Sequence, residues 1–166
     1  MKTMMRYLCA GALLLPLSCA KGNKMDESDV GHYLQNLKQA GYRYERQVDA
    51  RSWIVAFQGP GMNQAWSVAV AITGTGEKGR FISVGTTAWK GTKEPSRELA
   101  LFLLQMNAID NNVGALSVFQ NGREHFVQYF TKSPLEHYRA ERLLFDIGFV
   151  GGFADSIQPK IAALAR

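Results

Sequence analysis

Cysteine is scarce in this sequence of 166 residues: only Cys9 and Cys19 occur, and both lie near the start of the chain. Two cysteines in these places exclude a disulfide framework and a four-cysteine zinc site. Long apolar runs are also missing, because the longest one, residues 7–17, is shorter than the roughly 20 residues that a membrane-spanning helix needs. The folded part of the chain must therefore be held together by its hydrophobic core.

The excess of positive charge is modest. The formal net charge is +5, but Lys2 and Arg6 lie near the start, and the portion from Ala20 onward carries 17 basic and 14 acidic residues. Such a balance is ordinary for a protein surface. Residues 125–129 resemble the end of an RNA-recognition strand, yet the basic–glycine pair that precedes such a strand is reversed here, in residues 122–123. We expect no nucleic-acid partner.

The first twenty residues have the three-part layout of a secretory signal peptide. A basic start is followed by the apolar residues 7–17 and by a small-residue exit, Ser18, Cys19 and Ala20. Residues 15–19 resemble a bacterial lipobox, in which the chain is cut before the cysteine and the cysteine is lipidated. Cleavage after Ala20 is the alternative, and a cytosolic protein with an unusual N-terminus is a third.

We favour lipidation of Cys19. The leader then covers residues 1–19, a short polar tether covers residues 20–25, and a single α+β domain covers residues 26–166. This division predicts an exported protein of the cell envelope, held to a membrane by its N-terminal lipid and facing the periplasm or the cell surface.

Hydrophobic periodicity predicts an α+β domain, an antiparallel sheet with flanking helices in the order α-β-β-β-β-α-β-β-α. The first helix is indicated by apolar residues with i, i+3, i+4, i+7 spacing from residue 30 to residue 37. Strands are expected over residues 42–48, 53–57, 65–73, 81–89, 116–120 and 125–130. The last two are joined by Asn121-Gly122, a dipeptide favoured in hairpins.

Two further helices are predicted. One runs from Pro95 or Ser96 to about residue 109, and its apolar face is so broad that packing on more than one side is expected, because Leu101 and Leu104 extend it. The closing helix is expected to begin near residues 133–134 and to end or kink at Pro159. Glycines at positions 148, 151 and 152 predict a close approach of this helix to the sheet.

No catalytic or metal-binding motif stands out. His32, His125 and His137 have no further ligand at the spacing of metal motifs, and no Gly-x-Ser-x-Gly sequence occurs. Residues 74–79 are rich in glycine, but a strand is expected after them, which favours a hairpin turn over a phosphate loop. We predict a protein that is not an enzyme and uses no metal or cofactor. The alternative is a small-ligand-binding protein or hydrolase whose site assembles only in three dimensions.

Three tryptophans, Trp53, Trp66 and Trp89, lie in separate predicted strands. Packing in a core or an interface is the simplest interpretation of such large rings. The functional interpretation is a platform for a carbohydrate or a hydrophobic peptide, so these three residues are the candidate binding residues.

Residues 98–112, ELALFLLQMNAIDNN, followed by a hairpin and a long closing helix, resemble the YbjN family. Its members have a leucine-rich helix that ends in Met-Asn or Leu-Asn, with another asparagine a few residues on. Met106-Asn107 and Asn111 or Asn112 match these places, and the resemblance extends over about residues 26–160. A local interpretation of Asn107 is that it caps the carboxyl end of its helix.

The resemblance implies the fold of type III secretion chaperones and a dimeric binder of extended polypeptide segments, or a modulator of signalling, without catalysis. Together with the leader, it predicts a non-enzymatic envelope lipoprotein. Its partners would be a second copy of the chain and another protein, which it binds as a segment or modulates in signalling or secretion.

Overall fold

The computed structural model describes residues 24–74, 79–108 and 113–165, and it confirms the predicted α+β class and order of elements. The helices are α1 (Glu27–Gln35), α2 (Arg97–Asn107) and α3 (Ala140–Leu164), with a short 3₁₀ helix, η3 (Leu135–His137), before α3. The strands are β1 (Tyr42–Asp49), β2 (Ser52–Phe57), β3 (Trp66–Thr73), β4 (Phe81–Gly91), β5 (Ala115–Asn121) and β6 (Glu124–Pro134).

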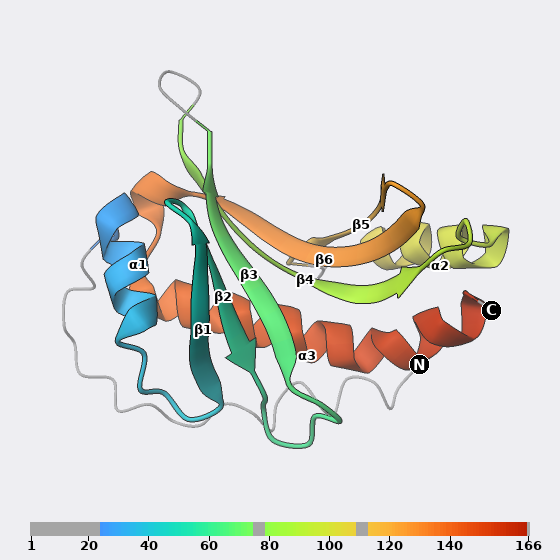
Figure 1. The fold of residues 1–166 in the computed structure, drawn as a ribbon, viewed down its shortest axis with the longest axis horizontal. Coiled ribbons are helices and arrows are strands. Elements are labelled where there is room, and N and C mark those ends of the chain that lie inside the picture. Colours follow the sequence, from blue (N-terminus) through green and yellow to red (C-terminus); the bar gives the residue numbers. More distant parts are fainter. Residues whose placement is uncertain (1–23, 75–78, 109–112, 166) are drawn as a thin grey trace.

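All six strands form one antiparallel sheet in the order β1-β2-β3-β4-β6-β5 (Figure 1). β1 to β4 are a meander in which each strand pairs with the next one along the chain. After α2 the chain returns as β5 at the outer edge, and β6 fills the place between β5 and β4. β1 and β5 are therefore the two edges of the sheet.

The long helix α3 covers one face of the sheet and contacts β2, β3, β4 and β6 (Figure 1). Its buried apolar residues are Leu143, Ile147, Val150, Ala154, Ile157 and Ile161. The predicted close approach is confirmed at two glycines: a Cβ on Gly148 would lie 2.7 Å from Tyr42 Oη, and one on Gly151 would lie 2.7 Å from Phe57 Cδ1. Nothing lies within 4 Å of such a Cβ on Gly152.

The predicted start of the closing helix is wrong, and the helix does not end at Pro159. Ser133 and Pro134 are the last residues of β6, and α3 begins only at Ala140, after η3. Pro159 lies inside α3, which continues to Leu164. Proline costs the helix one hydrogen bond, but Ile157 and Ile161 on either side of it are buried in the core. Burial of these side chains holds both parts of the helix against the sheet.

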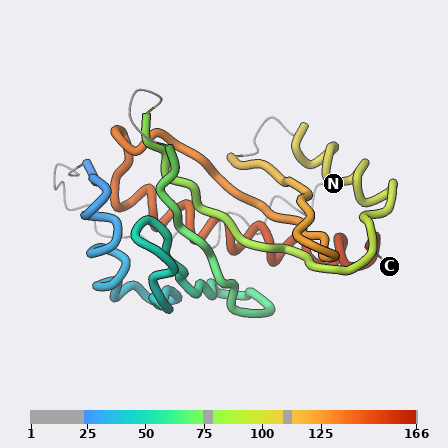
Figure 2. Tube along the Cα trace, turned by 45° about the horizontal axis from the view of Figure 1, so that its top comes forward, coloured from blue at the N-terminus to red at the C-terminus, as the bar shows by residue number. Residues whose placement is uncertain are grey.

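The described part of the chain begins at Lys24, beside the start of α3. Lys24 forms an isolated bridge with Arg139, and the Met25 N–H donates to Tyr138 O at 3.0 Å. Met25 is also buried in the core. These two residues of the predicted tether are thus part of the folded domain, because the Met25 side chain packs in the hydrophobic core. Figures 1 and 2 both place α1 at one end of the molecule and α2 at the other.

Tyrosines that are buried or half-buried predict a fold sensitive to alkali. Burial raises the pKa of Tyr33, Tyr42, Tyr129 and Tyr138 above the ordinary value, since the charged phenolate is poorly solvated there. For Tyr42, whose hydroxyl donates to Leu144 O at 3.0 Å, burial raises the pKa to about 12. A folded-state pKa above the unfolded value gives stability that is complete below about pH 10 and is lost as the pH rises through the folded-state pKa.

We therefore expect the free energy of unfolding to begin to fall above about pH 10, when the tyrosines of the unfolded chain ionise first. Urea denaturation at a series of alkaline pH values measures this loss, and tyrosinate absorbance follows the ionisation. Tyr42→Phe should reduce the loss. An unfolding free energy that stays constant from about pH 9 to about pH 12 would contradict the assignment.

Candidate functional site

The three tryptophans have different surroundings. Trp53 and Trp66 are only 3% and 6% exposed, so their rings belong to the core. The Trp66 indole N–H donates to Asp155 Oδ1 of α3 at 3.0 Å. Trp89 is half-buried, and its ring packs against Gly91 at the end of β4. With two of the three rings covered, these residues present no shared platform within the part of the chain that the structure describes. Cys19 lies outside that part.

A cleft of about 620 Å³ lies beside α1. Its lining comes from α1, the end of β1, β2 and the start of β4, and includes Ser28, Gly31, His32, Gln47, Trp53 and Arg80. Gly31 makes room for Trp53, because a Cβ at this position would lie 3.1 Å from the Trp53 ring. The Trp53 indole N–H is buried and has no hydrogen-bond partner among the described residues.

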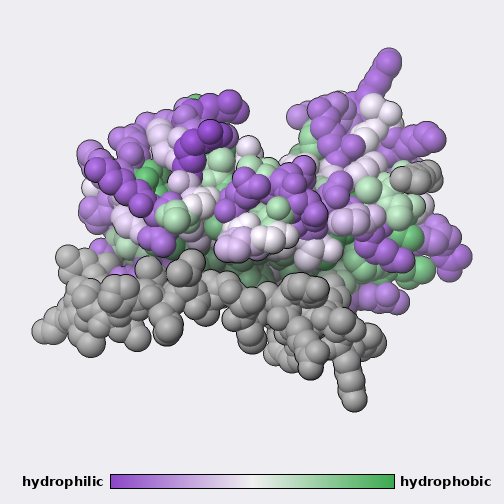
Figure 3. Space-filling view, turned by 90° about the horizontal axis from the view of Figure 1, so that it is seen from below, coloured by the Kyte–Doolittle hydropathy of each residue, from purple (hydrophilic) through white to green (hydrophobic). Residues whose placement is uncertain are grey.

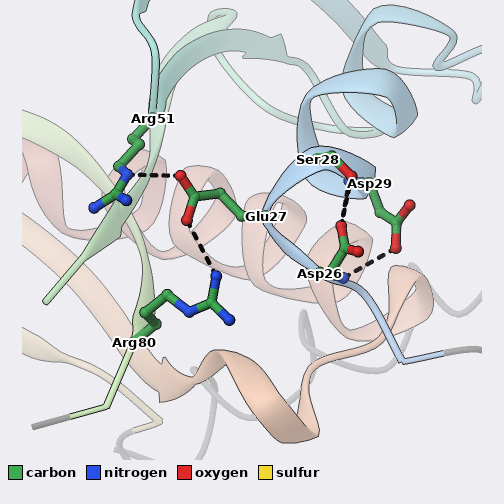
Figure 4. A network of polar contacts seen from close by, with 6 residues as sticks. All are labelled: Asp26, Glu27, Ser28, Asp29, Arg51 and Arg80. Carbon is green, nitrogen blue, oxygen red and sulfur yellow. Dashed lines mark hydrogen bonds and ion pairs between the residues drawn. The ribbon is translucent and has the colours of Figure 1, made fainter. Parts of the chain in front are cut away.

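Charged residues fix the start of α1, which lines this cleft (Figure 4). The Asp26 carboxylate caps the helix by accepting from Asp29 N, and the Asp29 carboxylate accepts from Asp26 N, both at 3.0 Å. Ser28 Oγ donates to Asp26 Oδ1 at 2.7 Å, and this bond, with that from Asp29 N–H, lowers the pKa of Asp26. A capping box of this kind defines where the helix begins.

Glu27 links α1 to the sheet. Its carboxylate lies between two guanidinium groups, with Arg51 Nε at 2.6 Å and Arg80 Nη1 at 3.3 Å (Figure 4). Both arginine side chains are about half exposed, so each pair contributes at most about 1 kcal/mol. The network orients α1 over the cleft and leaves Glu27 fully paired.

The residues of a hydrolytic site are not brought together. Ser28 donates to Asp26, and no bond joins Ser28 to His32 within the described residues. His125 is half-buried on β6, and His137 is exposed and pairs with Glu136 at 3.3 Å. In the same described ranges no group of three His, Cys, Asp or Glu side chains could hold a metal ion. The arrangement beside α1 is a polar cleft without an activated nucleophile.

The two edge strands of the sheet differ in chemistry. β1 carries four charged residues, Arg43, Glu45, Arg46 and Asp49, and its pairing with β2 is interrupted by two register shifts. Charges and bulges of this kind discourage pairing with a further strand. β5, with the sequence ALSVFQN, has no charged residue, proline or glycine, and it pairs regularly with β6. Only the β1 edge is therefore protected by its own residues.

Apolar side chains are exposed on β5 and on the neighbouring α2. Val118 and Phe119 of β5 are 44% and 38% exposed, and Leu101 and Leu104 of α2 are 49% and 64% exposed. We call these four residues the α2–β5 surface. Figure 3 shows hydrophobic residues among polar ones at its right-hand end, where Figure 1 places both α2 and the end of α3. Leu99 and Leu103 pack into the core, so α2 is buried on one side, and the predicted packing on a second side does not occur within the described residues.

Asn107 joins α2 to β5. Its Nδ2 donates to Leu116 O at 2.9 Å, and its Oδ1 accepts from Leu116 N at 2.7 Å. Leu104 lies three residues before Asn107 and neighbours it on the helix surface, whereas Leu101 is turned about 120° from Asn107 around the helix axis. Leu104 is therefore the exposed leucine on the Asn107 side of α2. The predicted cap at the helix end is replaced by this contact; Asn111 and Asn112 lie outside the described residues.

In comparisons with known proteins, no protein-family model and no curated protein matches the chain. The resemblance to the YbjN family is therefore a prediction from the residues quoted above. In residues 24–74, 79–108 and 113–165 no helix is both long and apolar enough to cross a membrane.

Proposed function

We propose that this protein is a non-enzymatic binding protein of the cell envelope that forms a homodimer through the α2–β5 surface. The observation that carries the proposal is the β5 edge without charged residues, proline or glycine, with exposed leucines on the neighbouring α2. An edge strand presents N–H and C=O groups to any strand that approaches it. Covering the apolar side chains nearby adds about 25 cal/mol for each Å² removed from water. A twofold dimer covers this surface on both copies at once.

The same architecture supports binding of another protein. The face of the sheet opposite α3 has exposed small residues, Ser67, Ala69 and Thr73 on β3, and pairing at β5 would join the two copies' sheets into one broad surface. An extended polypeptide segment, or a signalling or secretion partner, is the ligand that the resemblance to secretion chaperones implies. We propose this uncovered face as its binding surface.

A lipid on Cys19 fits the geometry of the proposed dimer. Lys24, which bridges Arg139, lies shortly before α1 in the chain, while α2 lies at the other end of the molecule (Figure 1). Four residues lie between Cys19 and Lys24, and the five steps along the chain can span at most about 18 Å. The anchor would therefore hold the α1 end near the membrane and leave the α2–β5 surface accessible.

Mass spectrometry of the N-terminal peptide from membranes tests the anchor. We expect a chain that begins at a lipidated Cys19, and we expect Cys19→Ser to release the protein from the membrane fraction. An unmodified chain that begins at Lys21 would contradict lipidation and indicate ordinary export.

The alternative, a small-ligand-binding protein or hydrolase, has the cleft beside α1 in its favour, since the cleft has enough volume for a small molecule. We rank this alternative second because Glu27 is already paired with two arginines, and Ser28 donates to Asp26. No group in this network is held ready to attack a substrate.

Amide hydrogen exchange at two protein concentrations tests the homodimer. We expect amides of β5 and of the exposed side of α2 to become more protected as the concentration rises, while amides of β1 do not change. Equal protection at both concentrations, together with a monomeric mass at the higher one, would contradict the proposal.

A further inference from the structure

At Leu116 the outer edge of β5 is already occupied by a side chain, and we call this contact the stop. The side-chain amide of Asn107 donates to the carbonyl of this residue and accepts from its N–H. These are the two bonds that one residue of a neighbouring antiparallel strand would make. Asn107 therefore occupies the place of the first residue of a further strand, and no strand can pair with Leu116 while it stays there.

Two outward-facing residues remain beyond the stop. Along an antiparallel strand, backbone groups point alternately toward one neighbour and the other. Since Leu116 points away from β6, Val118 and Gln120 do so as well, and Ser117 and Phe119 point toward β6. No hydrogen bond to the outward groups of Val118 or Gln120 is formed by the residues that the structure describes. The available edge is therefore short and defined.

We propose that Asn107 sets the register in which two copies of this chain pair. This inference rests on the proposed homodimer. With only two outward residues free, the antiparallel arrangement that uses both places Val118 opposite Gln120 of the partner subunit, and Gln120 opposite the partner's Val118. The twofold axis then passes between Phe119 and the partner's Phe119. Asn107 is a positioning residue in this arrangement, because it acts through Leu116 and marks where the partner's strand ends.

The hairpin and the aromatic residues fit this register. Leu116 falls opposite the partner's Gly122, where the strand ends: Asn121 is the last residue of β5 and Gly122 turns with a φ of 61°. The partner's strand thus stops where Asn107 stands. Phe119 stacks on Phe126 with ring centroids 4.8 Å apart and an interplanar angle of 9°. The twofold axis would place the equivalent pair of rings of the partner subunit beside this one, which gives a row of four rings.

Removing the stop should shift the pairing. In Asn107→Ala the backbone of Leu116 becomes free, and three outward residues are available. The arrangement that uses all three places Val118 opposite the partner's Val118 and adds two hydrogen bonds. Asn107→Asp keeps the acceptor for the Leu116 N–H but places a second acceptor oxygen against the Leu116 carbonyl, so it weakens the contact without removing the side chain.

Disulfide formation between copies measures the register. The full chain with Cys9→Ser and Cys19→Ser is given one new cysteine, Phe119→Cys or Val118→Cys, and is oxidised. The Cα atoms of residues directly opposite each other lie about 5 Å apart, whereas those of residues two places out of register lie about 7–8 Å apart. A disulfide does not form between residues whose Cα atoms are more than about 7 Å apart. We expect Phe119→Cys to form linked dimers at least about tenfold faster than Val118→Cys. Adding Asn107→Ala should reverse this order, and Asn107→Asp should change it in the same direction.

Faster linking of Val118→Cys in the chain that keeps Asn107 would overturn the register, as would an unchanged order in a folded Asn107 variant. Sedimentation of the unoxidised, cysteine-free chain separates this failure from that of the homodimer. A dimer that links in another order refutes only the role of Asn107, whereas a monomer refutes the homodimer and the register together.

Discussion

Replacing Asp146 by alanine is expected to lower the free energy of unfolding by about 3 kcal/mol. This carboxylate is 1% exposed, on the buried side of α3. It accepts a hydrogen bond from the Tyr138 hydroxyl, and Arg142 Nε lies 2.8 Å from its Oδ1. Alanine would leave the Tyr138 hydroxyl without its acceptor in a site where water does not compensate. The backbone of Tyr138 also holds Met25, so the entry of the chain into the fold should loosen as well.

Urea denaturation followed by circular dichroism measures the loss. Asp146→Asn keeps an acceptor for Tyr138 and gives up the ion pair, so a loss of about 1 kcal/mol is expected. Glu141→Ala, at an exposed position of the same helix, is the matched surface control and should change stability by less than about 0.5 kcal/mol. If Asp146→Ala cost no more than the Glu141 variant, the buried carboxylate would have no part in joining η3 to α3.

Val118→Lys is expected to weaken the homodimer about hundredfold, which corresponds to about 3 kcal/mol. In the proposed dimer this side chain is covered by the partner, and lysine would bring an unpaired charge into the interface from both copies. The fold of the single chain should not change, because Val118 is exposed on an edge strand. Sedimentation over a range of concentrations gives the dissociation constant, and urea denaturation gives the stability.

Val48→Lys is the matched control. Val48 is also an exposed valine on an edge strand, but it lies on the charged β1 edge. We expect its dimer affinity to equal that of the unaltered chain. Equal weakening by both lysines would mean that added charge, and not the β5 edge, controls association.

Local pattern in the sequence was sufficient to predict the elements. Along β3, for example, Val68, Val70 and Ile72 alternate with exposed or half-buried residues, and the structure buries all three. The apolar stripe of α3 likewise predicted its buried face. Its start and its continuation past Pro159 were missed, because both depend on burial against the sheet, which outweighs the preference of proline for helix ends.

The candidate site could not be predicted in the same way. Periodicity marks Leu101 and Leu104 as apolar but does not show that the sheet leaves them uncovered. The position of β6 between β4 and β5 makes β5 an edge, and this pairing joins segments far apart in the sequence. Asparagine is common at helix ends, so the sequence favours a cap at Asn107. Only the fold shows that its side-chain amide reaches Leu116. The signal that could have found the edge is the lack of charge in residues 115–121 beside the four charges of β1.

The central claim, that this chain is a binding protein joined through its β5 edge, is tested most directly by sedimentation equilibrium of the unaltered chain and of Val118→Lys. We predict a mass twice that of the chain for the unaltered protein and a return toward the monomer mass for the variant at the same concentration. A monomer mass for the unaltered protein across the concentration range, or a dimer that Val118→Lys leaves intact, would contradict it.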